Sequence, residues 1–472
     1  MRNNSSSIQL NRRNFLKMAG SAALLTAGAA AMPGMLRRTL LPEAVAEAQS
    51  PYDLYYAGTD GWIYLPPTPQ INLPGTNTAI HPDPLAPAPF NTYIFGFRNV
   101  SGMTTEQKNN QKNKAQHNAP LFWVNQFDPG NPVDFRMQVT NVGLALRPDL
   151  FDAHTLHWHG FRNVIPFFDG EPSGSIAVPT GANFTYIYRP REEGTYMFHC
   201  HVEDVEHVHM GMTGLVFVRP LQNGNTSFYP SGKYAYNDGN GLTGYDREYA
   251  MFLSEVWAES HWADAHIQLP EWSDYRADFA LLNGRVYPDT LAPNAPINAA
   301  ASVHALAVET INNPGQPDDG ELVAPPGRPE LQYQPHSSRI TCQPNERVLL
   351  RFANLGFKEE AMTLAGIQMR VIGRDATLMR GRDGTDTSYE TDTIIIGAGE
   401  SYDVIFTAPA YSGGSGSTGL GYDSYLLYNR AYTRSNNLAT GGFGGQATEV
   451  HVFPTGQIAA QQYPNDWGNP PA

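Results

Sequence analysis

Short runs of β-branched and aromatic residues, separated by Gly, Pro, Asn and Asp, fill the chain from about residue 90 onward. A first series of such runs covers 91–97, 121–125, 134–140, 183–188, 194–198 and 214–218. A second series covers 249–256, 279–282, 347–353, 369–372, 393–396, 401–407 and 424–429. Runs of this length between turn residues are typical of β-sandwiches. The pattern therefore predicts an all-β chain built from two tandem units.

The segments around these two series indicate the domain organisation. Residues 221–248, rich in Gly, Asn, Ser and Tyr, are expected to link a first domain, 49–220, to a second domain, 249–456. The stretch 65–118 is Pro-rich and then polar, and it predicts loop or edge structure. The tail 457–472 is expected to be loosely held.

The first residues have the layout of an export signal. Arg12 and Arg13 form a twin-arginine pair, and a weakly apolar stretch rich in Gly and Ala follows them. Cleavage is expected after Ala46 or Ala48, because small residues precede both positions. Residues 1–48 are therefore predicted to be the Tat signal peptide of a periplasmic or secreted protein. No membrane attachment is expected after cleavage.

Composition narrows the classes of function. Charged residues are only 16%, whereas Gly and Pro number 44 and 37, which disfavours long exposed helices. The formal net charge is −14, and loss of residues 1–48, with six basic and two acidic residues, would make it −18. Such a charge disfavours nucleic acid as a partner, since there is no excess of cations to replace counterions. Two cysteines in 472 residues exclude a disulfide framework.

Half of the 14 histidines lie between residues 154 and 209, in two short blocks. The first block reads HTLHWHG from His154, and the second reads YMFHCHVEDVEHVHMGM from Tyr196. Side chains alternate between the two faces of a strand. His154 and Cys200 are thus predicted on one face. The other face is predicted to carry four imidazoles, those of His157, His159, His199 and His201.

The set that contains Cys200 predicts a copper site. A thiolate and two imidazoles with a weak thioether form the ligand group of blue copper. The segment after Cys200 supplies the missing imidazole and thioether in His207 and Met212, with His209 and Met210 as alternatives. Zinc is the rival metal, since it also binds Cys and His. The predicted copper ligands are His154, Cys200, His207 and Met212.

The set of four imidazoles predicts a second metal site. Polar rings that share one face of a sheet are costly to bury unless a metal, water or mutual hydrogen bonds satisfy them. Two His-x-His pairs, one of which flanks Cys200, favour a metal over four separate structural histidines.

At this point the sequence resembles the multicopper oxidase family, that is, laccase-like proteins with tandem cupredoxin domains. The likeness rests on the blocks HTLHWHG, FDGEPSGSIAVPTGANFTYIYRP and GTYMFHCHVEDVEHVHMGMTGLVFV. The second half adds FALLNGRVYPDT, ERVLLRFANLG, MRVIGRDA and TDTIIIGAGESYDVIFTAP, so that the likeness covers roughly residues 90–456. It implies Greek-key cupredoxin domains, a type 1 copper that takes single electrons from a substrate, and a type 2/type 3 copper cluster that reduces oxygen to water.

The resemblance also implies a role for each residue. His154, Cys200, His207 and Met212 take the type 1 positions. His157 takes the type 2 position, and His159, His199 and His201 take type 3 positions. Cys200 stands between two cluster ligands, so that His199, Cys200 and His201 would carry the electron from one site to the other and are the predicted catalytic residues.

The sequence departs from the family pattern in two places. The spacing from Cys200 to His207 is two residues longer than the family leads one to expect, which leaves His207 and His209 open as ligands. The family's cluster also takes eight histidines from two domains, whereas the segments 361–366 and 425–430 of the second half contain none. The second domain is therefore predicted to be copper-free. A homo-oligomer in which two first domains meet could supply the missing imidazoles.

Several other residues near the blocks have less specific readings. Cys342 is predicted to be a buried free thiol. The acidic residues beside the ligands could orient imidazoles, but solvated loop positions are the simpler reading; they are Asp152, Glu203, Asp204 and Glu206. Asp169 is read as a turn residue.

Three functions are compatible with these observations. The leading hypothesis is an exported, laccase-like copper oxidoreductase with oxygen as the electron acceptor. The second is a nitrite-reductase-like enzyme, which needs fewer histidines, and the third is a non-catalytic electron-transfer or copper-binding cupredoxin. The electron donor stays open among phenols, metal ions and proteins.

Overall fold

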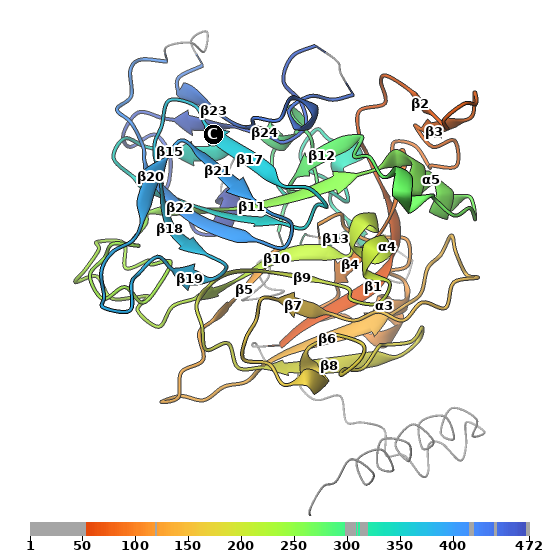
Figure 1. The fold of residues 1–472 in the computed structure, drawn as a ribbon, viewed down its shortest axis with the longest axis horizontal. Helices are drawn as coiled ribbons and strands as arrows, with labels where there is room; N and C mark the ends of the chain where they lie inside the picture. The colour runs from red at the N-terminus through yellow and green to blue at the C-terminus, as the bar shows by residue number, and fades with distance from the viewer. Residues whose placement is uncertain are drawn as a thin grey trace, which may run out of the picture. The chain divides into compact units, whose positions relative to one another are not determined.

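The computed structural model describes residues 53–118, 120–297, 308, 310–311, 320–414, 420–438 and 441–468 (Figure 1). The predicted export signal lies outside these residues. Within them, no helix has the length and apolar character needed to cross a membrane. Residues 51–472 form one compact unit.

The first half of this unit contains two four-stranded sheets that face each other. One sheet has the order β4 (Thr92–Asn99), β1 (Asp53–Ile63), β6 (Phe135–Asn141) and β8 (Asn183–Tyr188). The other has the order β5 (Phe122–Asn125), β10 (Thr213–Arg219), β9 (Gly194–His199) and β7 (His157–His159). In β6 the buried residues alternate with partly exposed ones, as expected for a strand that covers a core on one side.

The second half repeats this arrangement with longer sheets. One sheet has the order β12 (Phe279–Leu282), β11 (Arg247–Val256), β16 (Arg347–Asn354), β22 (Ser401–Thr407), β18 (Met369–Arg374) and β19 (Thr377–Leu378), with β20 (Tyr389–Thr391) also paired to β18. The other has the order β15 (Ile340–Cys342), β24 (Ala447–Val452), β23 (Asp423–Asn429), β17 (Glu360–Leu364) and β21 (Thr393–Ile396).

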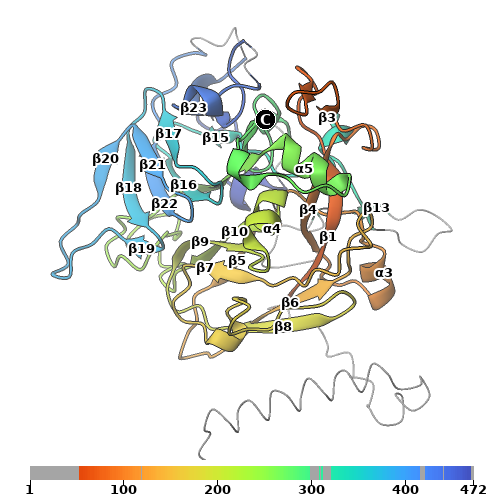
Figure 2. The ribbon, with the colours of Figure 1, turned by 45° about the vertical axis from the view of Figure 1, so that its right-hand side comes forward.

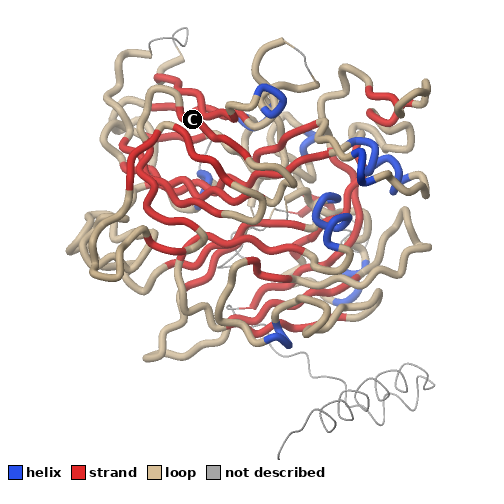
Figure 3. Tube along the Cα trace, in the orientation of Figure 1, coloured by secondary structure: helices blue, strands red, loops and turns tan. Residues whose placement is uncertain are grey.

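The remaining elements are short and lie between the strands (Figure 3). Two small hairpins consist of β2 (Ile71–Asn72) with β3 (Ala79–His81) and β13 (Thr310–Ile311) with β14 (Glu321–Leu322). The described α-helices are α3 (Thr105–Asn109), α4 (Asp204–Met210) and α5 (Ala258–Ala265). The 3₁₀ turns are η1 (Pro166–Phe168), η2 (Trp272–Asp274), η3 (Asp289–Leu291), η4 (Pro329–Leu331), η5 (Tyr432–Arg434) and η6 (Pro464–Asp466).

The two sandwiches share strand order and direction. In the first, β1 runs parallel to β6 and β10 runs parallel to β5. In the second, β11 runs parallel to β16 and β24 runs parallel to β15. Every strand predicted from the sequence is present, which confirms the all-β expectation. The sequence analysis treated the block around His157 as a strand, which β7 confirms; it did not predict β1, β2, β3, β13, β14, β15, β17, β19, β20 or β24, nor any helix.

The two sandwiches pack against each other through a third apolar cluster. It combines Trp123 and Phe217 of the first sandwich with Phe252 and Leu281 of the second. The prediction of a loosely held tail is wrong, because Trp467 is fully buried in this cluster. The tail is further tied down by the side chains of Asn465 and Asp466, which bond β11 and its neighbours.

Candidate metal centre

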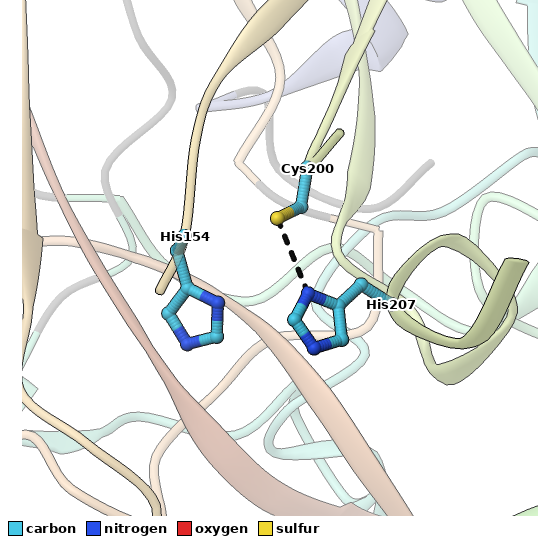
Figure 4. Close-up of side chains that lie close together, drawn as sticks. All are labelled: His154, Cys200 and His207. Carbon is cyan, nitrogen blue, oxygen red and sulfur yellow. Dashed lines mark hydrogen bonds between the residues drawn. The ribbon is translucent and has the colours of Figure 1, made fainter. Parts of the chain in front are cut away.

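Three of the predicted copper ligands meet in the interior of the first sandwich (Figure 4). Cys200 directly follows β9, His154 precedes β7, and His207 lies in α4. One ligand atom from each residue lies within 4.8 Å of the other two. His207 Nδ1 is 3.3 Å from Cys200 Sγ, and the His154 and His207 ring centroids are 5.1 Å apart. The three side chains are buried and converge on one point.

Met212 lies beside His154 and completes the group. A Cβ atom on Gly58 of β1 would lie 2.8 Å from His154 Cδ2 and 3.3 Å from Met212 Cε, so both side chains border this glycine. The backbone fixes the arrangement, because Cys200 N–H donates to Met212 O at 3.0 Å and Met212 N–H donates to His207 O at 2.9 Å. Gly58 had no signal in the sequence, since its strand was not predicted.

Cys200 and His207 shift each other's pKa. Burial alone would raise the pKa of the Cys200 thiol, but the His207 and His154 imidazoles lower it well below its usual value. Burial would likewise lower the pKa of His207, yet the Cys200 thiolate and the Asp152 carboxylate raise it to about 10. The thiolate is the form of cysteine that binds a metal, and His207 would release its proton when a metal takes its place beside the thiolate.

Four imidazoles gather on the opposite face of β7 and β9. The register of the two strands places His157 opposite His199. One ligand atom each from His157, His159 and His199 lies within 4.8 Å of the other two. His201 adjoins them, with its ring centroid 5.1 Å from that of His157 and 5.4 Å from that of His199. The structure thus brings the predicted second set together, and three of its members are the tightest group.

Hydrogen bonds on Nδ1 orient two of these rings. His157 Nδ1–H donates to Asp169 O at 2.7 Å, and His199 Nδ1–H donates to Cys200 O at 2.8 Å. Each bond leaves Nε2 unprotonated, and His199 Nε2 lies 3.4 Å from His159 Nδ1. Burial lowers the pKa of His199 to about 3, and it also lowers the pKa of His157 and His159. The rings are therefore neutral at pH 7, the form that binds metals.

Asp169 does more than the turn role that the sequence suggested. Its backbone closes η1, and its carbonyl accepts the hydrogen bond from His157. Its carboxylate also lies 3.4 Å from His157 Nδ1. Asp169 therefore holds the His157 ring in place through two oxygens.

Models of protein families, compared with the sequence, identify its family independently of the structure. One model described as multicopper oxidase matches residues 105–223, and a second with the same description matches residues 295–414. Together they cover just over half of the 472 residues.

The chain belongs to the multicopper oxidase family.

Known proteins similar to this multicopper oxidase include two laccases of Oryza sativa subsp. japonica. Laccase-25 is 25% identical over 277 residues, which are 58% of this chain and 37% of the relative. Laccase-7 is 23% identical over 322 residues, 66% of this chain and 45% of the relative. The chain thus spans less than half the length of these relatives.

A solved structure supports the fold. The blue copper oxidase from Nitrosomonas europaea aligns over 85% of both chains, with a TM-score of 0.50 and 18% sequence identity. This confirms the tandem cupredoxin-like architecture. The family assignment favours the oxidase hypothesis over nitrite reduction and over a non-catalytic cupredoxin.

The residues of the first group fit the copper that multicopper oxidases bind. A thiolate, two imidazoles and a thioether are the soft donors that copper prefers. His154 Nδ1 is buried and has no hydrogen-bond partner in the described part of the chain. Buried polar atoms are almost always satisfied in folded proteins, and a metal between His154 and Cys200 would satisfy this one.

The structure separates His207 from its alternative His209. His209 Nε2 accepts a hydrogen bond from Trp257 N–H at 3.1 Å, and its ring packs against Trp272 and Tyr275 of the second half. His207 and His209 both belong to α4 and are two positions apart, so they lie on opposite sides of this helix. A helical turn therefore carries His207 inward and His209 away from the thiol.

The second sandwich has a position equivalent to the thiol site. Leu364 pairs with Leu427 there as Trp158 pairs with Phe198 in the first sandwich. Asn429 N–H donates to Gln446 O at 2.9 Å, and Gln446 N–H donates to Arg434 O at 2.8 Å. These bonds repeat those among Cys200, Met212 and His207. Glu360 precedes Leu364 by four residues, as His154 precedes Trp158, so Glu360 corresponds to His154.

A closed polar network occupies this equivalent position. Asn429 Nδ2 donates to Glu360 and, at 2.8 Å, to Gln446 Oε1. The Arg434 guanidinium lies 2.9 Å from Glu255 Oε1 and 3.7 Å from Glu360 Oε1. The network contains no sulfur and no imidazole. Cys342, the other thiol, is buried and free, as the sequence predicted.

Proposed function

We propose that this chain is an exported multicopper oxidase that takes single electrons from a reducing substrate and uses them to reduce oxygen to water. The observation that supports it most is the position of Cys200. Its side chain meets His154 and His207 in the core, while its neighbours His199 and His201 face the opposite side of the strand.

Each group would hold its own copper. His154, Cys200, His207 and Met212 would hold a type 1 ion, and His157, His159, His199 and His201 would hold type 2/type 3 ions. Copper in these sites would supply one-electron redox chemistry and, at the imidazole group, the binding of oxygen.

The chain itself provides the connection between the two groups. Covalent bonds run from Cys200 Sγ through its backbone to the ring of His199 on one side and of His201 on the other. His199 Nδ1–H also donates to Cys200 O at 2.8 Å, which adds a shorter connection. Thr155 supports both groups, because its N–H lies 3.4 Å from Cys200 Sγ and its Oγ1 accepts a hydrogen bond from His201 N–H.

One chain supplies only half of the histidines that the family resemblance implies. We therefore propose that a second copy of the chain completes the oxygen site, with His157, His159, His199 and His201 of each copy at the contact. The partially exposed rings of His157 and His159 are accessible for this purpose. A strictly monomeric protein with a single copper per chain would contradict this assembly.

Export follows from the twin-arginine segment, which lies outside the described residues. We expect cleavage after Ala46 or Ala48 and delivery to the periplasm or the medium. Replacement of Arg12 and Arg13 by Lys should retain the precursor inside the cell, which fractionation and mass spectrometry would show.

Metal and oxygen measurements test the proposal as a whole. The copper-loaded protein should absorb strongly in the visible range, show an electron paramagnetic resonance signal, and consume oxygen with a reducing donor. His159→Ala should abolish oxygen consumption and leave the visible band unchanged. A visible band without oxygen consumption in the wild type would instead indicate a simple electron carrier.

A further inference from the structure

The His207 ring, which would be the electron-accepting edge of the thiol site, does not reach the surface. Its side chain is 0% exposed. Its outer nitrogen, Nε2, has no hydrogen-bond partner in the described part of the chain and points toward Asp152 Oδ2 at 3.7 Å. A small donor molecule therefore cannot touch this ring, and an electron must cross a layer of side chains that includes Asp152.

Carboxylates dominate that layer. Ligand atoms of Asp152, Glu203 and His207 lie within 4.8 Å of one another. Glu206 and Asp264 carry further carboxyl groups beside them. The acidic residues around His207 are Asp149, Asp152, Glu203, Asp204, Glu206 and Asp264.

One cation accompanies these acids, and it is already paired. Arg147 forms a two-pronged contact with Asp149, and it donates to Asp264 O at 2.8 Å. Its side chain is largely buried. The negative charge above His207 therefore comes mainly from the outer acids Asp152, Glu203 and Asp204, because burial raises the pKa of both Glu206 and Asp264.

Two large apolar side chains stand exposed among the acids. Phe151, directly before Asp152, is 80% exposed, and Val205, in the first turn of α4, is 51% exposed. Figures 1 and 2 show α4 next to α5 on the outside of the strands, with β7 near it. Exposed apolar groups surrounded by charges are characteristic of protein contact sites.

We propose that Phe151, Asp152, Glu203, Asp204 and Val205 form a docking surface for a small basic redox protein that is the electron donor. This proposal rests on the proposed function, because it assigns the donor of the same site. On docking, one electron leaves the donor, whose redox centre is oxidised by one unit, and the site held by His207 is reduced by one unit. No atom or proton is transferred.

The chemistry of the surface favours a protein over other donors. A phenol could pack against Phe151 and Val205, but it would gain nothing from the dispersed carboxylates. A metal ion could sit between Asp152 and Glu203, but it would gain nothing from Phe151 and Val205. A ring of lysines around an apolar patch would use both the dispersed carboxylates and the exposed phenyl group.

Binding to the copper-free protein tests the surface independently of the redox chemistry. The probes are a basic c-type cytochrome and, as a mismatch, acidic cytochrome b5, both oxidised and both titrated by calorimetry at low salt. The basic probe should bind with micromolar to millimolar affinity. Its affinity should fall at least about tenfold at 0.3 M salt, because salt screens charges over about 10 Å or less.

Surface variants locate the contact. Phe151→Ser should weaken binding of the basic cytochrome about tenfold and Asp204→Asn about threefold, since docking energy concentrates in central apolar residues. Glu390→Gln, an exposed acid in β20, is the matched control and should leave the affinity unchanged. All three positions are exposed, so unfolding midpoints should coincide.

Rapid reduction kinetics give a second measurement. Reduced basic cytochrome should bleach the visible band of the copper-loaded protein at a rate that falls with salt and falls in Phe151→Ser. Equal binding of both cytochromes, no binding at low salt, or equal effects of Phe151→Ser and Glu390→Gln would overturn the proposal. Failure of the proposed function would appear differently, as copper-loaded protein without a visible band.

Discussion

The two sandwiches have the same strand order, but different side chains fill the equivalent buried position. In the first, His154, Cys200, His207 and Met212 leave a nitrogen lone pair without a partner, so the group is complete only with a metal. In the second, Glu360, Asn429 and Gln446 bond one another, and Arg434, at the position of His207, pairs with Glu255 and lies 3.7 Å from Glu360. The fold supplies the position, and four side chains decide whether a metal is needed there.

The difference also extends to the strand that borders each site. Gly58 of β1 lies opposite Asn141, and Leu253 of β11 lies opposite Asn354 in the equivalent pairing. A glycine leaves room for the His154 ring and the Met212 methyl group. The second sandwich has no ring at that place, and a leucine fits.

Removal of the internal cation should have the largest effect. Arg434→Ala leaves the buried carboxylate of Glu255 without its partner. Loss of one member of a buried ion pair costs about 3–5 kcal/mol, which denaturant unfolding of the full chain would measure. Arg374→Ala, in a more exposed ion pair with Glu400, is the control and should cost about 1 kcal/mol or less. Equal losses would mean that the buried ion pair of Arg434 stabilises the fold no more than an exposed pair does.

Closing the space beside the thiol site should have the next largest effect. Gly58→Ala places a Cβ atom 2.8 Å from His154 Cδ2, so the ring must move. Disturbed support of a metal ligand lowers affinity about 10- to 100-fold, which competition with a copper chelator would measure. Gly441→Ala has no atom within 4 Å of the new carbon and should bind copper as the wild type does.

The buried Glu360 of the second sandwich should make the free energy of unfolding depend on pH. Burial raises the pKa of Glu360 from 4.5 to about 8, with Arg434 opposing the shift. Between these values the folded chain keeps a proton that the unfolded chain has lost, so the free energy of unfolding falls as pH rises. Glu360→Gln should remove a dependence of about 2 kcal/mol between pH 6 and pH 7.5. Glu390→Gln should preserve it, and an unchanged slope in Glu360→Gln would refute the assignment.

The smallest effect is expected at His209. His209→Phe removes the acceptor of Trp257 N–H, at a cost of about 1 kcal/mol in unfolding free energy. The visible spectrum of the copper-loaded protein should not change. His207→Phe should abolish the band, and the reverse pattern would show that the ligand is His209.

The strands were predictable because each carries its own apolar pattern, as the run 401–407 does in β22. The faces of the histidine pairs were predictable for the same reason. The sequence favoured His207 but left His209 open, because the choice depends on α4, a helix of seven residues with no apolar stripe of its own. The buried tail was missed because Trp467 packs against residues far away in the sequence.

The polar network of the second sandwich could not be predicted at all. Glu360, Asn429, Arg434 and Gln446 are common surface residue types, and their meeting depends on strand register. The sequence showed only that histidines are missing there. The residues that occupy the place of these histidines are brought together by contacts between segments far apart in the sequence.

Visible spectroscopy of the copper-loaded wild type and of Cys200→Ser tests the central claim most directly. The claim is that Cys200 and three core residues hold a copper while the second sandwich holds none. The wild type should show an intense sulfur-to-copper band that Cys200→Ser loses, and Cys342→Ser should keep it. A colourless wild type, or a Cys200→Ser spectrum identical to that of the wild type, would contradict the account.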